Sequence, residues 1–227
     1  DQDPIDNLIS VLNLKKTAVV VISKSGETLE TLAQFFFIYN KMKKKKIPLQ
    51  KRFFIITENK KSTLKKIQEK ENFNFFEHDK KIGGRFSVFS IVGLIPADTS
   101  GFNIKSFCNG AKNFLNLIRD EKANLFDLYF KGVFFQYLMA KKGFKINIFM
   151  PYIDSFQNFS LWIRQLWSES VGKGGKGTTL VNALGTVDQH SQLQIYLDGP
   201  KDKFFTLINL NQHQKKSDIL DCSIKDF

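Results

Sequence analysis

The chain has 227 residues, a length that can bury a sizeable core either as one large α/β domain or as two smaller ones. Its formal net charge of +12 raises a nucleic-acid hypothesis, because clustered Lys and Arg side chains neutralise phosphates. The basic residues are mostly Lys and accompany abundant Phe, Ile and Asn, a mixture that A- and T-rich codons explain more simply. The densest basic run, 41–46, is expected to end a helix, where cations suit the helix dipole. Nucleic acid is therefore not an expected partner.

The two cysteines, Cys108 and Cys222, have no metal-type or redox spacing with each other or with the three histidines. We therefore expect structural thiols in a reducing compartment and no bound metal. The longest apolar run, 88–97, is interrupted by Ser90 and Gly93 and is too short to span a bilayer. No signal peptide leads the chain, so these features predict a cytoplasmic protein without membrane contact.

The sequence opens with Asp1 in place of Met, and a helix signal follows at once, with Asp3 as N-cap and Pro4 at the first helical position. We therefore expect an internal fragment of a longer chain. A first sheet that lacks its opening strand would expose an edge, so the fragment is expected to tend toward aggregation.

The first half of the chain alternates strand and helix patterns. Residues 17–23 form a short, continuous β-branched run, which predicts a strand buried on both faces. Gly26 then turns the chain into a helix, a second strand is expected at 52–57 with a second helix at 62–70, and a short strand at 74–77. This βαβα order predicts a parallel sheet with helices on both faces and with ligands at the carboxyl ends of the strands.

The second half repeats the alternation, so a second α/β unit is expected to begin near residue 104. The domains would then be 1–103 and 104–227, and the last dozen residues are expected to be loose. The predicted elements are a loop at 83–87 that opens onto a helix through Leu94, helices at 104–119 and 124–142, a strand at 145–152, a helix that runs into a glycine-rich loop at 172–177, a helix at 188–197 and a strand at 204–208.

The stretch 23–28, Ser-Lys-Ser-Gly-Glu-Thr, lies between a predicted buried strand and a helix. Backbone N–H groups at the start of a helix, with the hydroxyls of Ser23, Ser25 and Thr28 and the charge of Lys24, would form a cradle for a phosphate. The spacing of a P-loop is missing. Hydroxyl residues at a helix start are also ordinary caps, so capping and phosphate binding both stay open at this point.

The stretch 83–85, Gly-Gly-Arg, is the second candidate for a functional site. Paired glycines such as Gly83 and Gly84 let a backbone approach a ligand closely, and Arg85 beside them can stabilise a developing oxyanion. The alternative is a surface turn followed by an exposed Arg.

The third candidate combines Glu169, at the end of an amphipathic helix, with His190. Glu169 is expected in the last helical turn on the partly buried side of Trp162 and Leu166, where the helix dipole and burial would both favour its protonated form. Such a carboxylate suits proton abstraction from carbon at neutral pH. His190, at an expected helix start, could exchange a proton with a sugar hydroxyl in its neutral form. A surface Glu at a frayed helix end and a structural His are the plain alternatives.

Four stretches resemble, in order and spacing, the motifs of the glucose-6-phosphate isomerase family: 23–31, 83–87, 165–173 and 185–190. The first alone would indicate only a phosphosugar-binding domain of the sugar-isomerase (SIS) type. The resemblance runs from end to end but covers about the middle half of a typical member, without the family's upstream phosphate loop and its C-terminal helix that bears a catalytic Lys. Ser25 stands where Thr is more usual and keeps the hydroxyl.

The resemblance implies two SIS-type doubly wound parallel-sheet domains with helices on both faces, the first incomplete at its N-terminus. It also implies a homodimer that interconverts glucose 6-phosphate and fructose 6-phosphate in glycolysis and gluconeogenesis, without cofactor or metal. By the same resemblance, phosphate and substrate binding is implied for Ser23, Lys24, Ser25, Thr28 and Gly84. Arg85 would stabilise the cis-enediolate, and Gln165 would position the substrate. Glu169 would transfer the proton between C2 and C1, and His190 would assist ring opening from across the dimer interface.

A non-catalytic phosphosugar-binding SIS module is the alternative function. Such a module needs the stretch 23–28 but has no use for Glu169 or His190. Their presence in register favours the isomerase.

Overall fold

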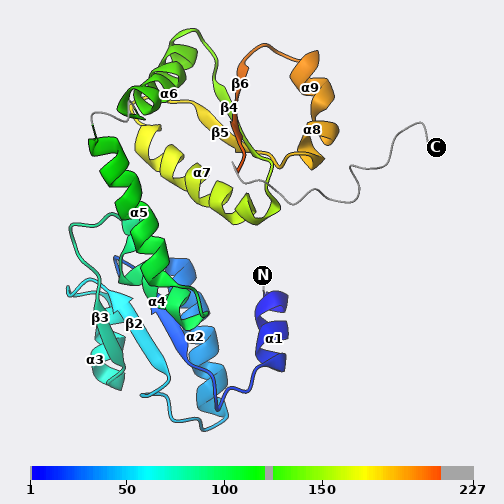
Figure 1. The fold of residues 1–227 in the computed structure, drawn as a ribbon. Helices are drawn as coiled ribbons and strands as arrows, with labels where there is room; N and C mark the ends of the chain where they lie inside the picture. The colour runs from blue at the N-terminus through cyan, green and yellow to red at the C-terminus, as the bar shows by residue number, and fades with distance from the viewer. Residues whose placement is uncertain (1, 121–124, 211–227) are drawn as a thin grey trace, which may run out of the picture. The chain divides into compact units, whose positions relative to one another are not determined.

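A computed structural model of the chain contains two parallel β-sheets, one from each half of the sequence (Figure 1). The structure describes residues 2–120 and 125–210. The chain divides into two compact units, unit 1 (Asp1–Leu117) and unit 2 (Ile118–Phe227), and each is described by itself. The assignment of SIS-type domains to 1–103 and 104–227 stays a prediction.

The described elements follow the alternating order that the sequence predicts. Those of unit 1 are α1 (Gln2–Val11), β1 (Val19–Ile22), α2 (Leu29–Lys44), β2 (Phe53–Thr57), α3 (Thr63–Glu71), β3 (Asn74–Glu77), the 3-10 helix η1 (Gly84–Phe89) and α4 (Ile91–Thr99). Helix α5 (Ile104–Arg119) crosses the division between the units, and unit 2 continues with α6 (Leu125–Lys141), β4 (Ile146–Pro151), η3 (Asp154–Phe156), α7 (Gln157–Val171), β5 (Thr179–Asn182), α8 (Val187–Ser191), α9 (Leu193–Leu197) and β6 (Lys203–Ile208).

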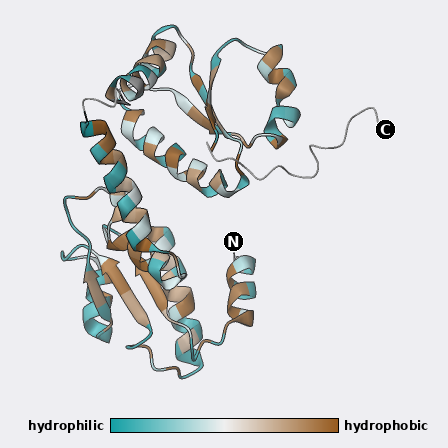
Figure 2. Ribbon diagram, viewed as in Figure 1, coloured by the Kyte–Doolittle hydropathy of each residue, from teal (hydrophilic) through white to brown (hydrophobic). Residues whose placement is uncertain are grey.

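The sheet of unit 1 has the strand order β1-β2-β3, and all its strands are parallel, as the βαβα pattern predicts. The register pairs Val21 with Ile55, and Ile55 with Phe75. Helix α2 packs Phe35 and Met42 into a fully buried core against β2, and Figure 2 shows the strands as hydrophobic and α3 as largely hydrophilic. The carboxyl ends of β1, β2 and β3 therefore lie along one edge of this sheet.

Strand β1 differs from the expectation that both its faces are buried. Val21 is 5% exposed, but Val20 on the other face is 36% exposed. The reason is topological, because β1 has one neighbour among the described strands and lies at the edge of this sheet, whereas a continuous apolar run is typical of a central strand. On the Val20 face, Phe76 of β3 is also exposed.

The sheet of unit 2 has the strand order β5-β4-β6 and is also parallel. The central strand β4 is buried along most of its length, which confirms the strand predicted at 145–152. A closed ring of hydrogen bonds joins β4 to its neighbours: Asn147 Nδ2 donates to Gln136 Oε1 at 3.0 Å, Gln136 Nε2 to Thr206 Oγ1 at 3.0 Å, and Thr206 Oγ1 to Asn147 Oδ1 at 2.9 Å. This ring satisfies the buried amide of Asn147 and ties α6 to the sheet.

Strand β5 was missed by the sequence prediction, and the helix predicted at 188–197 is in fact two helices. β5 has only four residues directly after a glycine-rich loop, so its pattern is too short to distinguish from that loop. The helix is interrupted at Gln192, whose φ of −113° is not helical. The helix expected to end at Leu94 instead continues as α4 to Thr99.

The remaining predictions concern the chain's ends and its helices. Asp3 lies inside the first turn of α1 and is therefore not its N-cap. Cys108 is a free thiol in α5, whereas Cys222 and the last dozen residues lie outside the described residues. Within the described part of the chain, no helix is long and apolar enough to cross a membrane.

Candidate active site

The loop from Ser23 to Thr28 leaves the carboxyl end of β1 and enters α2. Ser23 is 4% exposed, and its hydroxyl lies 2.9 Å from that of Thr28. The backbone N–H of Gly26 donates to Ser23 Oγ at 3.1 Å, and that of Glu27 donates to Ser25 Oγ at 3.1 Å. Thr28 is the N-cap residue of α2 but makes no side-chain cap bond. The Thr28 hydroxyl therefore joins the loop and does not cap the helix, whose N-terminal dipole attracts an anion.

Gly26 and Glu27 hold this loop against the start of α3. Gly26 has a φ of +70°, and a Cβ at this position would lie 2.2 Å from Ser62 Oγ, so the loop requires glycine here. The Glu27 carboxylate accepts hydrogen bonds from Thr63 N at 2.6 Å and from Thr63 Oγ1 at 2.8 Å. These bonds hold the pKa of Glu27 below its usual value.

Lys24 connects the loop to the segment that precedes the Gly-Gly-Arg stretch. Its ammonium donates to the carbonyl oxygens of Lys80 at 3.1 Å and Ile82 at 2.7 Å, and lies 3.5 Å from Glu58 Oε1. Glu58 also pairs with Lys60 at 2.6 Å, and the hydrogen bond from Lys60 holds the pKa of Glu58 below its usual value, with a smaller contribution from Lys24. Lys24 thus links the first candidate stretch to the residues directly before the second one.

The Gly-Gly-Arg stretch starts a 3-10 helix and is not a simple surface turn. Ser87 Oγ donates to the carbonyl of Gly84 at 2.6 Å, and the backbone N–H of Phe86 donates to that of Gly83 at 2.9 Å. The Arg85 side chain is half-buried, with its guanidinium carbon 4.5 Å from the centre of the Phe86 ring. No atom lies within 4 Å of a Cβ built on Gly84, so the described residues leave open space before this backbone.

Glu169 lies in the last turn of α7, as predicted, but its side chain is exposed and the expected partial burial is wrong. Trp167 explains the difference, because its ring nitrogen donates to the carbonyl of Thr178 at 3.0 Å and turns that side of the helix toward β5. Glu169 lies about 200° further around the helix and faces the other way. Gln165 Nε2 donates to Glu169 Oε1 at 2.9 Å, so the structure brings these two candidate residues together.

His190 lies in the last turn of the short helix α8, and not at a helix start as expected. Its side chain is exposed. Asp188 holds the start of α8, because it accepts from Leu184 N at 2.7 Å and from Ser191 Oγ at 3.1 Å. The N–H of Leu184 is the main cause that lowers the pKa of Asp188. The sequence analysis did not single out this Asp, although its position two residues before His190 is a usable signal.

Glu169 and His190 lie at opposite edges of the unit 2 sheet. The end of α7 is bonded through Trp167 to Thr178, which directly precedes β5 at the amino edge. The loop before His190 is bonded to the other edge, where Gly185 N donates to the carbonyl of Pro151 at the end of β4. A four-residue strand is about 13 Å long. Unit 2 therefore does not bring these two candidate residues together.

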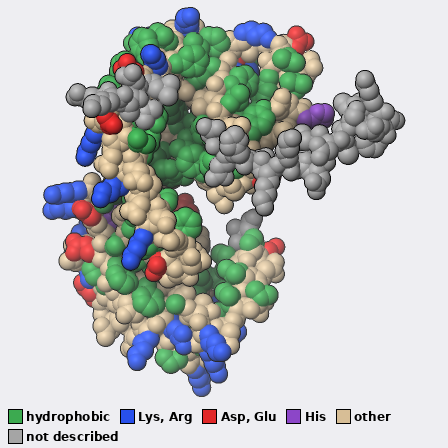
Figure 3. Space-filling model, in the orientation of Figure 1, with side chains coloured by type: hydrophobic (Ala, Val, Ile, Leu, Met, Phe, Trp, Pro, Cys, Tyr) green, Lys and Arg blue, Asp and Glu red, His purple; other side chains and the backbone are tan. Residues whose placement is uncertain are grey.

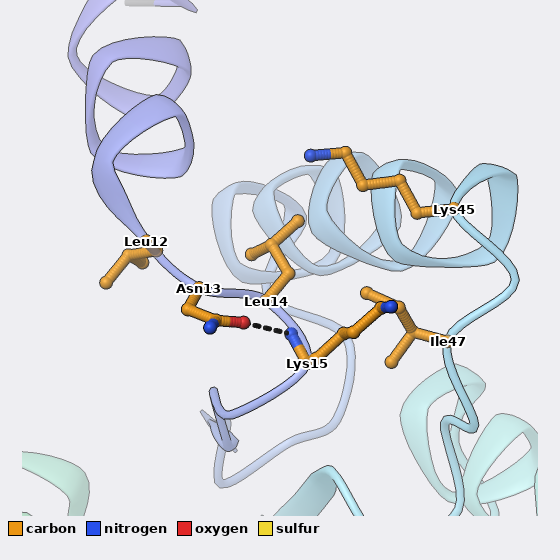
Figure 4. Close-up of a pocket in the computed structure, with 6 residues that line it drawn as sticks. All are labelled: Leu12, Asn13, Leu14, Lys15, Lys45 and Ile47. Atoms are coloured by element: carbon orange, nitrogen blue, oxygen red, sulfur yellow. Dashed lines mark hydrogen bonds between the residues drawn. The ribbon is translucent and has the colours of Figure 1, made fainter.

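Hollows also occur among the described residues away from the loop 23–28 and from Arg85. Lys and Arg side chains gather at the end of unit 1 where α2 terminates (Figure 3), consistent with the lysine run predicted to end a helix. An open cavity of about 230 Å³ lies there, about 24 Å along α2 from Thr28, lined by Leu12, Asn13, Leu14, Lys15, Lys45 and Ile47 (Figure 4). In unit 2 a cavity of about 140 Å³ borders Asn182, whose buried amide atoms have no hydrogen-bond partner among the described residues, and Asp188.

No cluster of three or more histidine, cysteine and acidic side chains within residues 2–120 and 125–210 could bind a metal ion. The titratable groups among the candidate site residues are those of Lys24, Arg85, Glu169 and His190.

The fold and the loop at the carboxyl edge of β1 together define an α/β protein of the SIS type, present here in part. The family model for phosphoglucose isomerase matches residues 1–201. The chain therefore belongs to the phosphoglucose isomerase family.

Relatives of known name cover nearly the whole chain. A probable glucose-6-phosphate isomerase of Methanococcus maripaludis is 42% identical over 214 residues, which are 94% of this chain and 48% of that protein. The glucose-6-phosphate isomerase of Methanocaldococcus jannaschii is 34% identical over 213 residues, 94% of this chain and 52% of that protein. The chain thus spans about half the length of the relatives it matches.

Solved structures share the fold of this chain. A hypothetical protein of Thermus thermophilus superposes with a TM-score of 0.80 at 32% identity, covering 91% of this chain and 50% of that one. A glucose-6-phosphate isomerase of Chlamydia trachomatis superposes with a TM-score of 0.68 at 23% identity, covering 88% of this chain and 40% of that one, and so shares the fold.

Proposed function

We propose that the protein is a glucose-6-phosphate isomerase, which interconverts glucose 6-phosphate and fructose 6-phosphate through a cis-enediolate. The observation that carries this proposal is the edge of unit 1 at which Lys24 joins the hydroxyl-rich loop to the segment before Arg85. An anion cradle beside a fixed guanidinium suits a phosphorylated substrate that develops negative charge as it reacts.

In the proposed mechanism, unit 1 holds the phosphate and stabilises the intermediate. The hydroxyls of Ser23, Ser25 and Thr28 and the first N–H groups of α2 bind the phosphate oxygens. The open space before Gly84 admits the sugar, and Arg85 stabilises the enediolate oxygen. Phe86, which stacks on the Arg85 guanidinium, limits the orientations that this side chain can adopt.

Glu169 carries the proton between C2 and C1 of the substrate. A general base needs its carboxylate held in one orientation, and the 2.9 Å hydrogen bond from Gln165 provides this. The exposure of the Glu169 side chain on α7 leaves it accessible to a substrate. Gln165, one helical turn earlier on the same face, orients both the base and the substrate.

His190 assists ring opening in a site that two copies of the chain share. The placement of Glu169 and His190 at opposite edges of one sheet supports this arrangement, because a single unit 2 does not present both groups to one substrate. We therefore propose a homodimer in which each site takes Glu169 from one copy and His190 from the other.

The same proposal extends to the cellular setting. The protein acts in the cytoplasm, in glycolysis and gluconeogenesis, with hexose 6-phosphates as substrates. It uses neither a metal nor an organic cofactor, and neither nucleic acid nor a membrane is a partner.

The test is conversion of fructose 6-phosphate to glucose 6-phosphate by the protein, with Glu169→Gln prepared in parallel. Because Gln has nearly the same shape but is not a base, we expect turnover to fall by about 100- to 10,000-fold while ligand binding is retained. The variant also controls for host enzyme in the preparation. Wild-type turnover in Glu169→Gln would refute the role of Glu169, and phosphosugar binding without any turnover would favour a non-catalytic SIS module.

A further inference from the structure

The Lys24 ammonium is surrounded by oxygen atoms of its own chain. It lies 2.7 Å from the Ile82 carbonyl, 3.1 Å from the Lys80 carbonyl and 3.5 Å from Glu58 Oε1. An ammonium group carries three N–H donors and no acceptor, so these oxygens match its hydrogen-bonding capacity. The carboxylate of Glu58, whose side chain is nearly buried, supplies a compensating negative charge.

The two carbonyl oxygens belong to the segment that leads directly into η1 and Arg85. Short-range hydrogen bonds also occur here: Ile82 N donates to Asp79 O at 3.1 Å, Lys81 N to Asp79 Oδ1 at 2.8 Å, and Phe86 N to Gly83 O at 2.9 Å. These bonds join residues that are two or three positions apart in the chain. Lys24 instead connects the segment across 56 and 58 residues to the loop 23–28.

We propose that Lys24 is a positioning residue, which fixes the 79–85 segment, and with it the backbone of Arg85, next to the loop 23–28, and that its ammonium is not itself a phosphate ligand. The inference rests on the proposed isomerase function and deepens it. A phosphate that recruited Lys24 would have to replace three oxygens already at or near hydrogen-bond distance. The phosphate is then held by hydroxyls and backbone N–H groups alone. Lys24 affects the reaction indirectly, through the position of Arg85.

The first arm of the test measures hydrogen exchange of the 79–86 segment in the ligand-free protein. Lys24→Met removes the charge-assisted bonds, and we expect amide exchange in this segment to accelerate about tenfold or more. Lys61→Met, an exposed lysine in the same unit, is the matched control and should leave the rate unchanged. Lys24→Arg keeps the charge and the donors and should restore most of the protection. Unchanged exchange in Lys24→Met overturns the proposal, and Lys24→Gln takes its place if the Met variant does not fold.

The second arm separates positioning from phosphate binding. In Lys24→Met we expect kcat to fall about tenfold or more, while the inhibition constant of inorganic phosphate changes less than about threefold. In an Arg85→Met background, Lys24→Met should cause little further loss, because both changes remove the same contribution. A loss of phosphate affinity as large as the loss of kcat would overturn the proposal.

The two arms also separate this inference from the proposed function. If the wild-type protein shows no turnover, the isomerase assignment fails on its own measurement. The hydrogen-exchange arm needs no turnover and still decides whether Lys24 fixes the 79–85 segment.

Discussion

Glu27 shows how a single side chain of the loop 23–28 stabilises the neighbouring helix. Its two carboxylate oxygens accept separately from the N–H and the hydroxyl of Thr63, which lies in the first turn of α3. An acidic group at a helix N-terminus also interacts favourably with the helix dipole. The pKa of Glu27 is consequently lower in the folded chain than its ordinary value of 4.5.

The lowered pKa sets the sign of a pH prediction. A carboxyl group with a depressed folded-state pKa contributes stability that is complete above its unfolded pKa and is lost as pH falls through the folded value. Glu27→Gln replaces one accepting oxygen by an amide donor, so we expect a lower urea midpoint than wild type at pH 7. The two midpoints should converge as the pH falls below 4.5.

Glu77→Gln serves as the control for this experiment, because Glu77 is an exposed carboxylate at the end of β3. Its substitution should leave the pH dependence of the urea midpoint close to that of wild type. A difference between Glu27→Gln and wild type that persists at acidic pH would refute the electrostatic explanation.

At the scale of elements, Gly26 determines how closely the loop after β1 approaches α3. Its φ of +70° disfavours any side chain, and a Cβ would lie 2.2 Å from Ser62 Oγ and 2.8 Å from Ser62 Cβ. We expect Gly26→Ala to destabilise the protein by about 1–3 kcal/mol, because strain and overlap occur together. Urea denaturation of the variant checks this value.

Gly110 is the matched control for the same substitution. It lies in helix α5, and nothing in the described chain is within 4 Å of a Cβ built there. Gly110→Ala should therefore stabilise the protein by about 0.5–1 kcal/mol, since Ala has the higher helix propensity. Equal effects of the two substitutions would contradict the packing explanation for Gly26.

At the scale of the whole molecule, the positions of Glu169 and His190 lead to a prediction about mixed dimers. If each site takes one of these residues from each copy, Glu169→Gln and His190→Gln should each be inactive alone. A mixed dimer then contains one complete site and one site with both changes. After subunit exchange at equal amounts, we expect about a quarter of wild-type activity to return.

This prediction is checked by unfolding the two variants together, refolding the mixture and measuring turnover of fructose 6-phosphate. Each variant refolded alone controls for recovery without mixing, and refolded wild type sets the maximum. Mixed dimers that form but stay inactive would show that the two residues do not serve one shared site.

Much of the fold was predictable because local patterns were strong. The β-branched run that contains Val21 and the apolar segment around Ile148 are both strands, and α5 has the bounds that its sequence predicts. The candidate site residues were proposed from motifs whose residues, order and spacing carry the resemblance, and their roles stay a prediction. β5 could not be predicted in this way, since four residues beside a glycine-rich loop carry too little periodicity.

The alternating α/β order and the four motifs, and with them the family, could be recognised from the amino-acid sequence. Only the tertiary structure decided that Val20 lies on an open sheet face, that Glu169 is exposed, and that Lys24 bonds to carbonyls 56 and 58 residues away. The tertiary structure was also needed to show that Glu169 and His190 lie at opposite edges of the unit 2 sheet. The physical reason is that helix and strand periodicity is encoded by neighbours in the chain, whereas burial and hydrogen-bond partners depend on which strand becomes an edge and which helix face meets it.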